Sequence, residues 1–117
     1  MAQFENINAS LISTTTTDAI QIPAGHSLVG VYTPQLTSTS FTIQHAFAKD
    51  GTFATLKDPT GLITGSVGGT ITFTIGGTSL GTHAIPPSVS ACLNSWIKLV
   101  FSSSESAGIT LIFREIK

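Results

Sequence analysis

The chain has 117 residues, enough for one domain around a single core, and only 9% of them are Asp, Glu, Lys or Arg, against roughly 25% in an ordinary soluble domain. Its cations are scattered and its net charge is −1, which excludes the clustered basic face of a nucleic-acid-binding protein. The N-terminus is not signal-like, no apolar run approaches the ~18–20 residues of a membrane helix, and a single cysteine, Cys92, cannot form an internal disulfide. We therefore expect neither nucleic acid nor membrane as a partner.

Hydroxyl groups take the place of the missing charges. The chain contains 18 Thr and 14 Ser, many of them alternating with Ile, Phe and Leu. This alternation predicts β-strands, because successive side chains of a strand point to opposite faces. A weakly charged surface offers little repulsion between copies, so the composition favours a subunit of a permanent assembly over a catalyst.

Residues 1–17 have a pattern of their own. Their apolar positions are irregularly spaced, and a β-preferring threonine tract follows at 14–17. We consider two interpretations, a first strand of the sheet or an extended arm that lies on a neighbouring subunit. In the second, the anchors contacting the neighbour are Phe4, Ile7, Leu11 and Ile12.

Two short strands follow, at 20–22 and 28–32, separated by a turn at 23–25 and ended by Pro34. A clean alternation then begins at Ser40. Its predicted inward face consists of Phe41, Ile43, His45 and Phe47.

A three-residue loop at 49–51, with Gly51 in the left-handed conformation, is predicted to turn the chain back. This register places Phe47 opposite Phe53, whereas a two-residue turn would place it opposite Ala54. We prefer the first, because an aromatic pair on the core face buries more area.

Between 58 and 95 the pattern is less regular. A turn is predicted at 58–61 and a strand at 70–75, and the segment 83–88 cannot be a central strand because its two prolines lack a backbone donor. Residues 88–95 have room for one helical turn at most. The inward side chains of the 70–75 strand are Ile71, Phe73 and Ile75.

The last part of the chain predicts a hairpin between 96–101 and 109–114. Its register pairs Phe101 with Ile109, Leu99 with Leu111 and Ile97 with Phe113, all facing the core. The other face is too apolar for a solvated sheet, and Trp96 would lie over Arg114. We expect this face to be covered by the N-terminal arm or by a second chain, with contacts at Trp96, Val100 and Ile112.

These elements predict an all-β fold, a single antiparallel β-sandwich of about seven to eight strands, with a jelly roll as one topology it could have. In this interpretation residues 1–17 form the arm or first strand, and residues 18–117 form the sandwich domain.

No residue pattern points to catalysis or to a metal. His26, His45 and His83 are on separate segments without ligand spacing, and we expect His45 to be a hydrogen-bonded core residue. No serine lies in a G-x-S-x-G elbow, and the carboxylates fall in turns, near the termini or, for Glu105, at a loop tip.

The glycine-rich stretch 76–82 lacks the ending of a phosphate-binding loop, and Cys92 is expected to be a small buried hydrophobe. The sequence therefore predicts a protein that is not an enzyme and has no catalytic residue, cofactor or metal site.

Several segments resemble small β-sandwich proteins of tailed-phage virions. The resemblance covers residues 20–117 and depends on pattern rather than on particular chemistry, and it departs from the family in the hydroxyl-rich strand 70–75. The matching segments are LVGVYTP at 28–34, TSFTIQ at 39–44, KDGTF at 49–53, DPTG at 58–61, IPP at 85–87, WIKLV at 96–100 and AGITLIFR at 107–114.

The resemblance implies a capsid cement or decoration protein, made in the host cytoplasm and placed on the capsid surface of the virion. Its partners would be adjacent subunits of the major capsid protein and copies of itself, as dimers or trimers. A tail or baseplate component is an alternative. A carbohydrate-binding module is another, although sugar platforms need exposed aromatic rings, for which the chain offers Trp96 and Tyr32.

Overall fold

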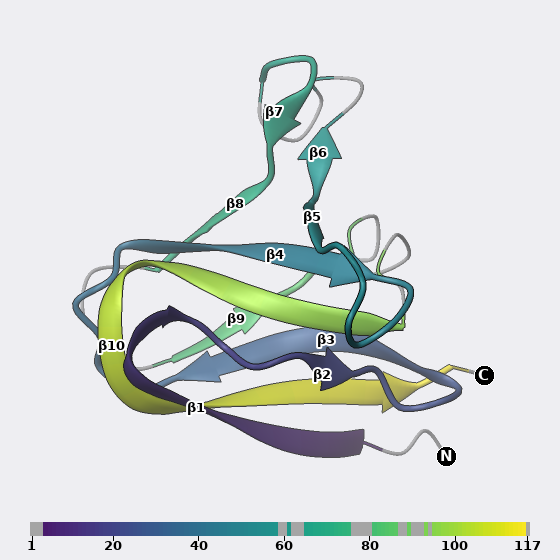
Figure 1. The fold of residues 1–117 in the computed structure, drawn as a ribbon, viewed down its shortest axis with the longest axis horizontal. Helices are drawn as coiled ribbons and strands as arrows, with labels where there is room; N and C mark the ends of the chain where they lie inside the picture. Colours follow the sequence, from purple (N-terminus) through teal and green to yellow (C-terminus); the bar gives the residue numbers. More distant parts are fainter. Residues whose placement is uncertain are drawn as a thin grey trace.

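A computed structural model describes residues 4–58, 61, 65–75, 81–86, 89, 93 and 95–116. The elements are almost entirely antiparallel β-strands (Figure 1). In chain order they are β1 (Phe4–Thr16), β2 (Ile20–Gln21), β3 (His26–Thr33), β4 (Ser40–Ala46), β5 (Ala54–Thr55), β6 (Lys57–Asp58), β7 (Gly69–Thr70), β8 (Thr72–Thr74), β9 (Gly81–Ala84) and β10 (Trp96–Glu115).

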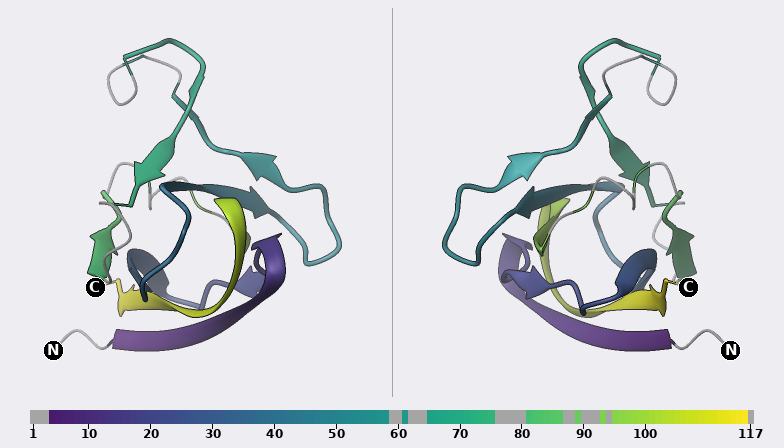
Figure 2. Two further views of the ribbon diagram at one scale, coloured as in Figure 1. Left: turned by 90° about the vertical axis from the view of Figure 1, so that its left-hand side faces the viewer. Right: turned by 90° about the vertical axis from the view of Figure 1, so that its right-hand side faces the viewer.

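The fold is organised by β10, a bent strand of 20 residues. Its first part, residues 96–101, pairs with β4, and its last part, residues 110–115, pairs with β3. One strand thus contributes to two layers, and the curl that results is visible from both sides in Figure 2.

Each layer can be followed outward from β10. The first contains β2, the beginning of β10 and β4, with β5 and β8 both paired to the other edge of β4. The second contains β1, the end of β10, β3 and β9. β6 and β7 form a small separate sheet that projects away from the curl (Figure 1). The predicted all-β, sandwich-like fold is confirmed.

Residues Phe4–Thr16 are the first strand of the chain's own sheet. They pair with β10 from Phe4 opposite Arg114 to Leu11 opposite Ala107. The register then shifts at the bend, where Ser13 has a φ of 50°, and Thr16 lies opposite Val100. β1 therefore follows β10 around the same corner.

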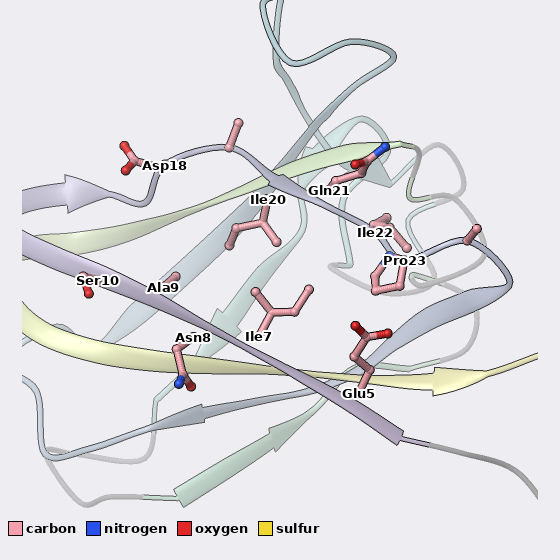
Figure 3. A pocket seen from close by; sticks show the side chains of 12 residues that line it. Glu5, Ile7, Asn8, Ala9, Ser10, Asp18, Ile20, Gln21, Ile22 and Pro23 are labelled. Atoms are coloured by element: carbon pink, nitrogen blue, oxygen red, sulfur yellow. The ribbon is translucent and has the colours of Figure 1, made fainter.

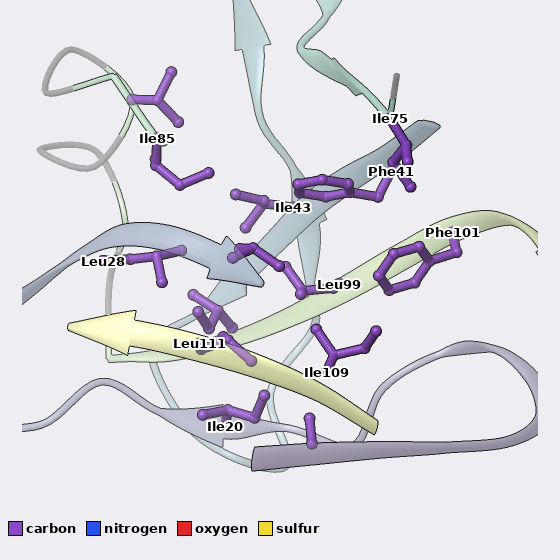
Figure 4. Packing of buried hydrophobic residues seen from close by; sticks show 14 of the residues in the cluster. Ile20, Leu28, Phe41, Ile43, Ile75, Ile85, Leu99, Phe101, Ile109 and Leu111 are labelled. Carbon is purple, nitrogen blue, oxygen red and sulfur yellow. The ribbon is translucent and has the colours of Figure 1, made fainter. Parts of the chain in front are cut away.

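The core lies between the two layers (Figure 4). The six inward residues predicted for the last part of the chain are confirmed, each 2% exposed or less. Phe41 stacks on Phe73 with ring centroids 5.1 Å apart and lies 5.5 Å from the ring of Phe101. Ile71 and Ile75 are buried as predicted, and Phe73 is half-buried against them.

The predicted pairing of 96–101 with 109–114 is wrong. The serine-rich segment between them does not turn but continues as strand, so each part of β10 finds a different neighbour. Trp96 lies opposite Ala46 and Gln21, and Arg114 lies opposite Ser27 and Phe4, so these two side chains are not partners as predicted.

The predicted Phe47–Phe53 pair is also wrong. β5 sets Ala54 opposite His45, and Phe47 is 78% exposed. The Gly51 N–H donates to the Ala48 carbonyl at 3.0 Å, but Gly51 is not among the glycines with positive φ. Instead, the turn folds back over Ala46, and a Cβ at Gly51 would lie 3.6 Å from the Ala46 Cβ.

The remaining predictions between 58 and 95 are tested only in part. The Gly61 N–H donates to Asp58 Oδ1 at 3.1 Å, with φ 77° at Gly61, as expected for a turn. His83 lies in β9, which pairs only with β3 among the described strands. Most of 76–82 and 87–94, including Cys92, lies outside the described residues.

Candidate protein-interaction surface

A groove with a volume of about 740 Å³ lies between β1 and the segment that contains β2 (Figure 3). These are the outer strands of the two layers on one side of the sandwich, and among the described strands each of them pairs only with β10. The groove is lined by Glu5, Ile7, Asn8, Ala9, Ser10, Asp18, Ala19, Ile20, Gln21, Ile22, Pro23 and Ala24.

The floor of the groove is apolar and its ends are acidic. Ile7 and Ile20 project toward one another from the two borders, while Asp18 and Glu5 lie at opposite ends (Figure 3). The His26 Nε2 is 3.9 Å from the Glu5 carboxylate, whose side chain is 53% exposed. No lysine or arginine is among the lining residues. The arrangement suits an apolar occupant with positive ends.

The four predicted contact residues of β1 have different environments. Phe4 is 64% and Ile12 80% exposed, so both are free to contact another molecule. Ile7 is half-buried and belongs to the groove. Leu11 is 2% exposed and packs into this chain's own core, so it is wrong as an anchor for another subunit.

The three predicted contact residues of β10 are all half-buried. The Lys49 Nζ lies 5.9 Å from the Trp96 ring centroid, so the 47–53 loop provides part of the cover for this tryptophan. Val100 lies beside Thr16 and Thr42 in the sheet.

The Ile112 side chain extends over β3, since its Cδ1 lies 3.6 Å from the position that a Cβ at Gly30 would take. The N-terminal strand runs beside β10 rather than over its outer face, so the expected cover by an arm is wrong. Cover by a second chain stays a prediction.

Several exposed apolar side chains were not predicted. Phe47 and Val67 are each 78% exposed and Ile116 is 63% exposed, while Tyr32, one of the two rings considered for a sugar platform, is 37% exposed. The turn residues directly after Phe47 were the available signal that its side chain is exposed. β4 ends at Ala46, and a residue beyond the end of the strand is not held on the core face.

The bend of β10 encloses a buried carboxylate, Glu105. It accepts hydrogen bonds from the Ser38 N–H at 2.6 Å, the Ser38 hydroxyl, the Thr37 hydroxyl at 3.0 Å and the Thr37 N–H at 3.3 Å. Burial alone would raise the pKa of Glu105, but these donors outweigh it and hold that pKa below its usual value. The prediction that Glu105 lies at a loop tip is wrong, because the segment around it is strand.

The three histidines remain apart. His83 Nε2 is 3.0 Å from the Thr33 hydroxyl, and His26 Nδ1 is 3.0 Å from the Ala24 carbonyl. His45 is half-buried, but its buried Nδ1 has no hydrogen-bond partner in the described part of the chain, so the hydrogen bond expected for it is not found there. Among the described residues no three His, Cys, Asp or Glu side chains cluster to hold a metal ion.

Comparison of the chain with protein-family models, with curated proteins and with solved structures gave no match. The resemblance to phage virion proteins therefore stays a prediction. Within the described ranges, none of the secondary structure is a helix of the length and apolarity needed to cross a membrane.

Proposed function

We propose that this chain is a non-enzymatic structural protein of a phage virion, a capsid cement or decoration protein that binds adjacent subunits of the major capsid protein. The observation that carries the proposal is the pair of exposed apolar side chains on β1, Phe4 and Ile12, on a molecule with very few charges. Exposed apolar groups on a weakly charged surface are typical of a surface that another protein covers.

The expected gain from covering these residues is appreciable. Complete burial of a large apolar side chain stabilises by about 1.5–3 kcal/mol, and Phe4 and Ile12 begin 64% and 80% exposed. Because β1 is held along most of its length by β10, the two side chains are presented from an ordered strand. Little conformational freedom would then be lost when a partner covers them.

A tail or baseplate component would bind through the same exposed side chains of β1, so the test below must also distinguish this role from the capsid role. A sugar-binding role has less support, because Trp96 is half-buried with Lys49 beside its ring.

The proposal is tested by co-sedimentation of the purified chain with phage shells that lack it. We expect saturable binding, weakened at least tenfold by Ile12→Ser and unaffected by Val67→Ser, a matched control because Val67 is 78% exposed on the projecting β6–β7 unit. Absence of binding to shells, or equal binding of the two variants, would contradict the proposal. Cryo-EM of the particle then distinguishes a capsid position from a tail position.

A further inference from the structure

We propose that the groove between β1 and β2 takes an extended segment of another polypeptide as an added strand, apolar in its middle and basic at both ends. Assigning this segment to the capsid shell protein depends on the function proposed above. The existence of the groove and the chemistry of its occupant do not depend on that function.

The borders of the groove are two strand edges. β1 and β2 pair with β10 on one side, and no backbone hydrogen bond joins them to each other in the described part of the chain. An edge strand directs every second pair of its backbone N–H and C=O groups away from its neighbour, which makes it a template for another strand. Two such edges facing one space favour an extended peptide over a compact ligand.

The floor of the groove is the least buried part of the core among the described residues. Ala9 and Ile20, each 8% exposed, are the least buried members of the core cluster among the described residues, and both line the groove. Ile7 and Ile22 beside them are only partly buried. Small apolar side chains on one face of an added strand would complete the burial of these four residues, which supplies the driving force for docking.

The charges at the groove select the ends of the occupant. Glu5 and Asp18 lie at opposite ends, and the lining contains no lysine or arginine to neutralise them (Figure 3). The residues of β1 that line the groove run from Glu5 to Ser10, a length of about 20 Å at ~3.3 Å per residue. An occupant of about seven residues would therefore place a lysine or arginine near each carboxylate.

The test uses the synthetic peptide acetyl-Lys-Thr-Val-Thr-Val-Thr-Lys-amide, in which the lysines and valines share one face. We expect it to slow hydrogen exchange of alternate amides of β1 between Glu5 and Ser10. The matched peptide with glutamate in place of both lysines should bind at least tenfold more weakly, and a backbone N-methylated version should not protect these amides. Absence of protection by the lysine peptide, or equal binding of the lysine and glutamate peptides, would overturn the inference.

Charge exchange makes the test specific to the groove. The double variant Glu5→Lys, Asp18→Lys should reverse the preference, so that it binds the glutamate peptide better than the lysine peptide. The control Asp50→Lys, in the exposed 47–53 loop, should keep the original preference. Amide protection that appears without peptide and increases with protein concentration would identify a second copy as the occupant and would also overturn the inference.

Shell binding separates this inference from the proposed function. If shells bind the double variant and the original chain equally well, the groove is not the docking site for the shell, so the assignment of the segment to the shell protein fails while the proposed function stands. If the peptides behave as expected but shells do not bind the chain, the proposed function fails while the groove remains a strand-binding site.

Discussion

The bend of β10 and the groove between β1 and β2, two strands that both pair with β10, satisfy their polar groups in opposite ways. At the bend, the Glu105 carboxylate accepts hydrogen bonds from Ser38 and Thr37, and the Ser103 N–H donates to the Ser38 hydroxyl at 3.1 Å. At the groove, β1 and β2 show strand edges that pair only with β10 among the described strands. The chain thus completes one corner of its sandwich internally and leaves, on one side, two strand edges with no further neighbour among the described strands.

The largest effect is expected at the bend. Glu105→Ala removes the acceptor for the backbone and side-chain donors of Ser38 and Thr37, of which the Ser38 N–H is buried. Because hydrogen bonds to a charged group are stronger than neutral ones, we expect the free energy of unfolding to fall by about 2–4 kcal/mol. Urea unfolding followed by circular dichroism measures this change.

The control for the Glu105 variant is Asp50→Ala in the exposed 47–53 loop, which should change the free energy of unfolding by less than about 0.5 kcal/mol. Equal effects of the two substitutions would mean that the bend is not held by its carboxylate.

A smaller loss is expected at Thr17, between β1 and β2. The Thr17 N–H donates to the Leu99 carbonyl, and the Leu99 N–H donates to the Thr17 hydroxyl, each at 3.0 Å. Thr17→Val keeps the shape but leaves the Leu99 N–H without its acceptor, so we expect a loss of about 1–3 kcal/mol in the free energy of unfolding.

Thr52→Val, on an exposed residue, serves as the matched substitution for Thr17→Val and should be nearly neutral. If Thr17→Val is also neutral, the edge strand does not depend on this side-chain contact.

The pH dependence of stability gives a subtler test of the bend. Since the pKa of Glu105 is lowered in the folded state, its stabilising contribution is present above the ordinary value of 4.5 and is lost as the pH falls from there through the folded pKa. Between pH 6 and pH 3, the unfolding free energy of Glu105→Gln should therefore decrease less than that of the original chain. Parallel pH profiles for the two proteins would contradict this assignment.

The inward residues of β10 could be predicted from the sequence because the phase of an alternating strand is a local property. Leu99 and Leu111 are both buried as expected, although their strands do not pair with each other. The serines and glycine of 102–108 resemble a turn, but pairing with β1 and the contact with Ser38, 67 residues from Glu105, hold them as a bent strand. The local sequence of 102–108 does not distinguish a turn from a bent strand.

The groove could not have been predicted in the same way. Ile7 and Ile20 belong to separate strands that pair with opposite ends of β10, and they meet only because β10 bends. The sequence predicted contact residues on β1, but it did not distinguish Leu11, which is buried, from Ile12, which is exposed. That difference follows from the register of β1 on β10.

The smallest effect on stability, and the sharpest contrast with the bend, is expected from a charge change at the groove. Asp18 is exposed, so Asp18→Lys should alter the free energy of unfolding by less than about 0.5 kcal/mol, as is usual for surface substitutions. The same variant should weaken binding of the lysine peptide severalfold, because one end of the groove would then repel it. Thermal unfolding and peptide titration of one preparation measure both quantities. If Asp18→Lys destabilised the fold as strongly as Glu105→Ala, the groove, like the bend, would contribute to the stability of this chain rather than to binding.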